Sequence, residues 1–150
     1  KELNQCRAEH TVLKAVVKLL EDKQTKMVTK VFERLLATAN KLAGPLLKTP
    51  LDYHDGEIGR FSDKGIWIPV TAFSGTEEAL TFAAISLALS AQAAFKLVII
   101  DELGRMDAGI RAKLASRLIE LVAAGDIHQA ILLDTTANWM PDGINVIKVG

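Results

Sequence analysis

The first part of the chain carries apolar side chains in a heptad pattern. Nine positions follow one another in alternating steps of three and four residues: Leu3, Cys6, His10, Leu13, Val17, Leu20, Gln24, Met27 and Val31. Seven of these nine side chains are apolar, which is typical of the seam of a coiled coil. No Gly or Pro precedes Gly44 and Pro45, so the pattern predicts one helix over residues 1–43. At about 1.5 Å per residue this helix spans roughly 65 Å, more than a small domain needs.

From Val28 onward the apolar positions cover a wider face of the expected helix. They are Phe32, Leu35, Leu36, Ala39 and Leu42. A face of this width suits packing against a globular body. We therefore expect a coiled-coil arm over residues 1–43 whose end docks on a domain formed by residues 44–150. The competing interpretation is an ordinary amphipathic helix that packs along its whole length on its own domain.

Short runs separated by turn residues follow the helix. Three of them have the length and composition of strands: residues 51–54, 57–61 and 66–70. Asp55-Gly56 predicts a hairpin turn, because glycine accepts a positive φ angle. Pro69 cannot donate a backbone hydrogen bond, so its strand belongs at the edge or end of a sheet. This segment predicts a small β-hairpin region.

The remainder of the chain alternates apolar helices with short buried strands. Residues 76–94 are apolar on nearly all sides of a helix, and residues 108–124 are amphipathic, with Gly125 as the expected C-terminal cap. Three apolar runs predict buried strands: residues 97–100, 130–133 and 144–149. Alternation of this kind predicts an α/β fold, with a mostly parallel sheet covered by helices.

The composition indicates in which cellular compartment the protein works, but it does not indicate a function. The 150 residues carry 18 basic and 18 acidic side chains, so net charge gives no argument for nucleic acid or an anionic membrane. Cys6 is the only cysteine, which excludes an internal disulfide and favours a reducing cytoplasm. The sequence shows no bilayer-spanning apolar stretch and no signal segment, so we expect no membrane partner. The chain opens with Lys1 rather than methionine, which favours a fragment or a processed product.

The expected strand at residues 97–100 ends directly in two carboxylates, Asp101 and Glu102. Ligands of parallel sheets gather at the carboxyl ends of the strands. Phosphoryl-transfer sites need one carboxylate to hold the magnesium shell and another group to orient the attacking water. Neighbouring residues at a strand end can divide these tasks, because their side chains point in different directions. The alternative is a strand that ends in acidic surface residues without chemistry.

Ser74 and Glu77 form a capping-box pattern at the start of the apolar helix. Gly75 keeps the backbone approachable there, so the free amides of the helix start can bind an anion such as a phosphate. Glu77 and Glu78 weaken this hypothesis, because nearby carboxylates oppose a bound anion. The simpler interpretation is that Ser74 caps the helix and does nothing more.

Together these features resemble the C-terminal half of SMC, SbcC and RecN-type ATPase heads. In that family a coiled-coil arm, a small antiparallel piece, the ABC signature, the Walker B strand and the D-loop follow in this order. The resemblance covers essentially the whole chain and rests on Ser-Gly-Thr-Glu at residues 74–77, on the strand that ends in Asp101-Glu102, and on Asp107. It implies the P-loop NTPase fold of an ABC-type ATPase head, with ATP and Mg²⁺ as cofactors.

The resemblance also implies a role for each motif residue. Asp101 would coordinate Mg²⁺, and Glu102 would polarise the water that attacks the γ-phosphate. Asp107 would be the D-loop aspartate at the interface between two heads. The signature loop, which contacts the ATP held by the opposing head, would consist of Ser74, Gly75 and Thr76.

Partners and a setting follow from the same resemblance. The chain would hydrolyse ATP only when completed by the N-terminal, Walker A half of the head and by a second head in a homodimer. The work of this family in DNA repair, recombination and chromosome organisation implies DNA and a nuclease subunit as further partners. It also implies a cytoplasmic or nucleoid-associated location.

Three departures from the family pattern leave alternatives open. Thr76 stands where the family usually has glycine, and the segment 101–107 is one residue shorter than the usual D-loop. Thr135 stands where a switch histidine is expected, and a hydroxyl cannot do the acid–base work of an imidazole. One alternative is therefore a non-catalytic interaction module with a degenerate ABC head. Another is a defence-type ABC ATPase.

The sequence contains no Gly-x-x-x-x-Gly-Lys-Ser/Thr phosphate loop, and therefore no glycine-rich cradle for a triphosphate. We expect the purified 150-residue chain to hydrolyse ATP no faster than buffer does. Phosphate release at saturating Mg²⁺-ATP measures this rate. Unaided turnover on the order of 1 s⁻¹ would contradict the interpretation of the chain as half of a head.

Overall fold

The computed structural model describes residues 2–101, 103–135 and 139–147, with side chains described from His10 onward. The chain divides into two compact units, Lys1–Glu33 and Arg34–Gly150. Helix α1 (Glu2–Ala43) forms the first unit and contributes its last turns to the second. The single long helix predicted from the heptad pattern is thereby confirmed.

The apolar seam of α1 is exposed in the first unit. Leu13, Leu20 and Met27 are 65%, 60% and 70% exposed, and Val17 and Val31 are also more than half exposed. Within the described part of the first unit these apolar side chains have no neighbour that covers them. Pairing of the seam with a second helix stays a prediction.

The second unit begins with a small antiparallel sheet. Its strands are β1 (Leu51–His54), β2 (Glu57–Phe61) and β3 (Trp67–Pro69), in that order across the sheet. Asp55 and Gly56 both have positive φ angles, as the predicted turn between β1 and β2 requires. Pro69 ends the edge strand β3, where its missing N–H costs the sheet no hydrogen bond. The predicted hairpin region is confirmed.

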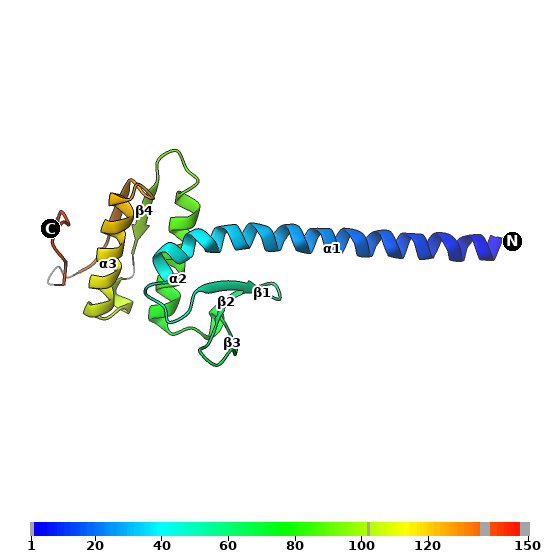
Figure 1. Cartoon of the computed structure of the whole chain (residues 1–150), viewed down its shortest axis with the longest axis horizontal. Helices are drawn as coiled ribbons and strands as arrows, with labels where there is room; N and C mark the ends of the chain where they lie inside the picture. The colour runs from blue at the N-terminus through cyan, green and yellow to red at the C-terminus, as the bar shows by residue number, and fades with distance from the viewer. Residues whose placement is uncertain (1, 102, 136–138, 148–150) are drawn as a thin grey trace. The chain divides into compact units, whose positions relative to one another are not determined.

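The rest of the second unit alternates helix and strand. It consists of α2 (Gly75–Ser90), β4 (Leu97–Ile100), α3 (Ala108–Ala123) and β5 (Gln129–Leu132), with short 3₁₀ turns at Val70–Ala72 and Leu103–Arg105. Strands β4 and β5 pair in parallel, with Ile100 opposite Leu132. Figure 1 shows β4 between α2 and α3, with α2 in contact with β4 and α3 in contact with β5. The mixture of helices and strands is compatible with the predicted α/β class, with a parallel sheet of two strands in the described part of the chain.

One continuous core lies inside the second unit. Apolar side chains from the end of α1, from both other helices, from β4 and from the loops meet there; the most deeply buried include Leu42, Leu80, Leu87, Val98, Leu103, Met106, Leu114, Leu121 and Ile127. The widened apolar face predicted near the end of α1 supplies Leu36, Ala39 and Leu42 to this core. The last turns of α1 are thus part of the globular unit.

Two element predictions differ from the structure by more than one residue at an end. The strand predicted at 144–149 is wrong for residues 144–147, which form no strand; residues 148 and 149 lie outside the described residues. An apolar run becomes a strand only if its backbone groups find a neighbouring strand, and none pairs with these described residues. Helix α2 ends at Ser90 rather than at the predicted residue 94. The hydroxyl of Ser90 donates to the carbonyl oxygen of Leu97 at the start of β4.

Within the described part of the chain, no helix combines the length and the apolar character needed to cross a membrane.

Two leucines of α2 provide a matched test of the core. Leu87 is 1% exposed and Leu89 is 58% exposed, although they lie two residues apart on one helix. We expect Leu87→Ala to lower the free energy of unfolding by about 2–5 kcal/mol, because it removes buried methyl groups and leaves a cavity. Leu89→Ala should change it by less than about 0.5 kcal/mol. Urea unfolding of the chain measures both; equal losses would contradict the placement of α2.

Candidate functional site

The start of α2 has the geometry of a complete capping box. The Glu77 amide donates to Ser74 Oγ at 3.4 Å, and the Ser74 amide donates to Glu77 Oε2 at 2.9 Å. The Ser74 hydroxyl also donates to Glu77 Oε2 at 2.9 Å. These reciprocal bonds fix where the helix begins and how its first amides point. The capping box predicted from the sequence is confirmed.

Gly75 and Thr76 differ in what surrounds them. Ser74 and Gly75 are exposed, and a Cβ atom added to Gly75 would meet no atom within 4 Å. The backbone at Gly75 is therefore open to an approaching molecule. Thr76 instead uses its hydroxyl to donate to the carbonyl oxygen of Arg105, at 2.9 Å. Arg105 belongs to the segment that follows β4, so this bond ties the start of α2 to that segment.

Asp101 and Asp107 follow β4 in the chain, before and after the 3₁₀ turn at Leu103–Arg105. Asp101 is the first residue after β4 and is exposed, and Glu102 lies outside the described residues. Asp107 is the N-terminal cap of α3, where its Oδ1 accepts a hydrogen bond from the Ile110 amide at 2.9 Å. The predicted D-loop aspartate thus has a structural task in this chain. The segment between Asp101 and Asp107 is the one that contacts Thr76 through Arg105.

Both carboxylates in the first turn of α2 are paired with arginines. Glu77 Oε1 lies 2.5 Å from Arg60 Nη2, and Glu78 Oε2 lies 3.2 Å from Arg105 Nη1. Burial raises the pKa of Glu77, but hydrogen bonds from Ser74 and Arg60 and the charge of Arg60 outweigh it, so the pKa lies below the usual value. The negative charge expected to oppose an anion at this helix start is thus compensated by cations.

Asp134 is a buried carboxylate that sequence reasoning did not single out. It follows β5 at the same sheet edge as Asp101, and its side chain is only 2% exposed. Its Oδ2 accepts hydrogen bonds from Arg111 Nη1 and from Trp139 Nε1, each at 2.6 Å. Arg111 Nε also donates to the Met106 carbonyl oxygen at 2.8 Å. An acidic residue directly after the expected strand at residues 130–133 was the available signal, but its partner Arg111 lies 23 positions away in the chain.

Thr135, the residue in the place of the expected switch histidine, is exposed. Its amide donates to Asp134 Oδ1 at 2.7 Å. The side chain that is fixed at the end of β5 is therefore the carboxylate of Asp134. Among residues whose side chains are described, no group of three or more His, Cys, Asp or Glu side chains could hold a metal ion by itself.

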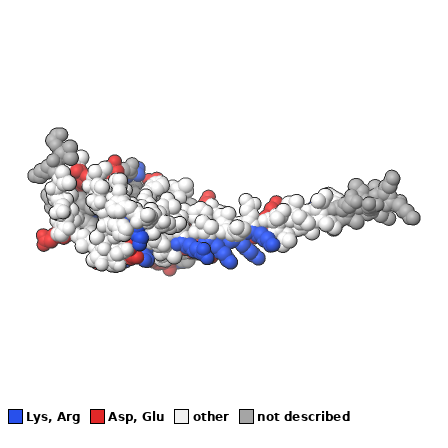
Figure 2. All heavy atoms as spheres, turned by 90° about the horizontal axis from the view of Figure 1, so that it is seen from above, with Lys and Arg blue, Asp and Glu red and all other residues white. Residues whose placement is uncertain are grey.

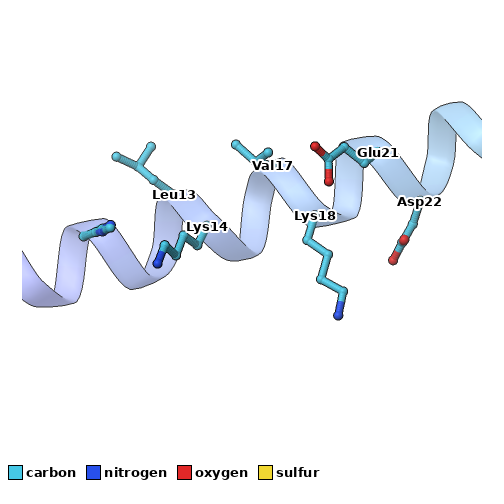
Figure 3. Close-up of a pocket in the computed structure, with 7 residues that line it drawn as sticks. Leu13, Lys14, Val17, Lys18, Glu21 and Asp22 are labelled. Carbon is cyan, nitrogen blue, oxygen red and sulfur yellow. The ribbon is translucent and has the colours of Figure 1, made fainter.

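A surface hollow of the first unit lies along α1. It is lined by residues of this single helix: His10, Leu13, Lys14, Val17, Lys18, Glu21 and Asp22. Figure 3 shows Leu13 and Val17 pointing to one side of the helix and Lys18 to the other. Because one helix supplies every wall, this is an open strip of surface, and Leu13 and Val17 belong to the predicted coiled-coil seam.

Basic side chains gather in a row along α1, as Figure 2 shows. Lys23, Lys26 and Lys30 are exposed and follow one another at helical spacings of three and four residues, so they share one face. The zero net charge of the chain conceals this local positive surface.

No protein-family model matches this sequence, and no curated protein was found to be similar to it.

The pH dependence of stability tests the geometry around Glu77. Because the pKa of Glu77 is lowered on folding, its carboxylate stabilises the fold fully above the unfolded pKa of about 4.3. This contribution is lost as the pH falls through the lower folded pKa. We therefore expect Glu77→Gln to be less stable than the original chain at pH 7, with a difference that shrinks steadily below pH about 4.

Glu78→Gln is the matched control, because Glu78 is the neighbouring carboxylate and its pair with Arg105 is more exposed. Its effect at pH 7 should stay within about 0.5 kcal/mol. Urea midpoints measured from pH 3 to 7 give both curves. A Glu77→Gln difference that is independent of pH would contradict the ion pair and the capping bonds.

Proposed function

We propose that this chain is the C-terminal half of an SMC/SbcC-like ATPase head, which joins a second head around ATP and releases it after hydrolysis. The assembled head, meaning this chain together with the polypeptide segment that supplies the phosphate loop, is the unit that acts. Such a head converts a local change of charge at the nucleotide into movement of long helical arms. The proposed setting is DNA repair, recombination or chromosome organisation, in the cytoplasm or at the nucleoid.

The observation that carries the proposal is the hydrogen bond between Thr76 and the Arg105 carbonyl oxygen. It joins two sequence motifs that lie about 25 residues apart, the serine-capped helix start and the segment after the acidic strand end. A nucleotide site shared between two heads needs both motifs on one rigid body. Each motif alone has a purely structural explanation, whereas their direct contact favours a common task.

The proposed division of labour uses the described geometry. Asp101 leaves the carboxyl end of a parallel strand and is exposed, which suits a residue that holds Mg²⁺ from one side. Magnesium commonly takes one or two protein carboxylates and completes its shell with phosphate oxygens and water, so the lack of a three-residue cluster among the described side chains fits this ion. When bound, Mg²⁺ neutralises charge that develops on the phosphate oxygens. Glu102 orients the attacking water in this proposal.

The start of α2 would meet the phosphate of the opposing head. Free amides at a helix N-terminus bind anions, and Gly75 leaves the backbone accessible. Arg60 and Arg105 compensate the two carboxylates that would otherwise repel a phosphate. The hydroxyl of Thr76 is engaged with Arg105, so in this chain it restrains the loop in addition to occupying the usual glycine position.

The arm supplies the remaining proposed contacts. The exposed seam of α1 suits a second helix in a coiled coil, and the row of Lys23, Lys26 and Lys30 suits the phosphate backbone of DNA. A nuclease subunit is a further proposed partner, from the family resemblance alone.

A second candidate is a non-catalytic interaction module with a degenerate ABC head. Thr135 in the place of the switch histidine favours it, as does the engagement of Asp134 with Arg111 and Trp139, which occupies that carboxylate structurally. A defence-type ABC ATPase uses the same site chemistry and stays an alternative.

Glu102→Gln in the assembled head separates these candidates. A glutamine keeps the size of the side chain but cannot accept a proton from water, so we expect turnover to fall by on the order of 10²-fold or more while ATP binding persists. The ATP-bound dimer should then accumulate, which size-exclusion chromatography with Mg²⁺-ATP detects.

The control is Glu120→Gln, near the C-terminal end of α3. An assembled head with this substitution should hydrolyse ATP at the original rate. If Glu102→Gln leaves both turnover and dimerisation unchanged, the ATPase proposal fails and the interaction module is favoured.

A further inference from the structure

Arg60 is a buried charged residue between apolar neighbours of the antiparallel sheet. It lies on β2, is 8% exposed, and stands opposite Leu51 on β1 and Ile68 on β3. Its inward-facing neighbours in the sheet are thus apolar, and an apolar residue would fit the position. Burying a guanidinium costs free energy unless every N–H group is satisfied, and Arg60 Nε has no hydrogen-bond partner among the described residues.

The other two nitrogens of Arg60 make specific contacts. Nη1 donates to Thr49 Oγ1 at 3.3 Å, and Nη2 donates to Glu77 Oε1 at 2.5 Å. The guanidinium also lies over the ring of Phe73, 5.5 Å from its centre, at a distance suited to a cation–π contact. Thr49 holds one end of the group, while Phe73 and Glu77 lie on either side of the Ser74–Thr76 loop in sequence.

The carboxylate of Glu77 connects Arg60 to Ser74 through hydrogen bonds. Its Oε1 faces Arg60, and its Oε2 accepts hydrogen bonds from both the amide and the hydroxyl of Ser74, each at 2.9 Å. With one oxygen held by Arg60, the carboxylate plane has a fixed orientation, and the second oxygen fixes Ser74. In an ordinary capping box this carboxylate bonds only to the N-cap residue; here its other oxygen is also held by Arg60 of the antiparallel sheet.

We propose that Arg60 is a positioning residue that sets the geometry of the Ser74–Thr76 loop, so that the antiparallel sheet controls how this loop meets the triphosphate of the opposing head. The inference rests on the proposed function for its consequence, but the anchoring of Ser74 by Arg60 is independent of it. A buried ion pair gives little net stability compared with an apolar replacement, which is consistent with a role in orientation.

The first measurement uses the 150-residue chain alone and compares Arg60→Met, Arg60→Lys and the control Lys41→Met, which breaks the exposed pair with Asp126. Arg60→Met should raise the pKa of Glu77, read from its side-chain carboxyl ¹³C shift. It should also speed hydrogen exchange of the Ser74 amide by on the order of tenfold. Arg60→Lys keeps the charge and should retain part of both effects, whereas Lys41→Met should match the original chain.

The second measurement uses the assembled head. Arg60→Met should weaken ATP-driven association of two heads by on the order of tenfold and leave the ATP affinity of a single head unchanged, because the loop contacts only the opposing nucleotide. Arg60→Lys should restore association in part. A uniform loss of both affinities would indicate a merely structural role and overturn the proposal.

The outcomes separate the two proposals. If the original assembled head shows no ATP-driven association, the proposed function fails, and the exchange and pKa data still decide whether Arg60 holds Ser74. If Arg60→Met leaves Ser74 exchange and the Glu77 pKa unchanged, the positioning role is overturned whatever the heads do. Should Arg60→Met fail to fold, Arg60→Lys and Glu77→Gln give the same test: unchanged Ser74 exchange in both overturns the proposal.

Discussion

The fixing of helix α2 along strand β4 is the constraint on which the second unit depends. The helix buries one broad face, through residues such as Leu80, Ala84 and Leu87, so it cannot slide or turn without exposing apolar surface. Hydroxyl groups then fasten both of its ends. Ser90 donates to the carbonyl oxygen of Leu97 at the start of β4, and Thr76 donates to that of Arg105 after β4. The serine-capped loop therefore has a fixed position relative to the acidic end of β4.

The charges around the start of α2 are compensated by ion pairs. Carboxylates in the first turn of α2 stabilise the helix by interacting with its dipole, but they repel an incoming phosphate. Arginines from two different places, Arg60 on the antiparallel sheet and Arg105 after β4, neutralise them. Gly75 is exposed, with open space where a Cβ atom would lie, and Asp101 is an exposed residue. Our proposal assigns an anion to the first and a hydrated cation to the second.

Local patterns in the sequence were sufficient to predict most elements. Heptads predicted α1, Asp55-Gly56 predicted the first hairpin, and Ser74 with Glu77 predicted the cap, because each signal depends on neighbours in the chain. The strand expected at residues 144–147 failed because strand formation depends on a partner strand. The pairings of Arg60 with Glu77 and of Arg111 with Asp134 were missed for the same reason. They join residues 17 and 23 positions apart, which periodicity does not report.

A structure of the assembled head with Mg²⁺ and a non-hydrolysable ATP analogue tests the central claim most directly. The account predicts two heads with the triphosphate between them, the Ser74 loop of one head at the γ-phosphate and Asp101 of the other at the magnesium shell. Loss of this arrangement when the analogue is omitted would agree with it. A nucleotide bound elsewhere, with the Ser74 loop and Asp101 both facing bulk solvent, would contradict it.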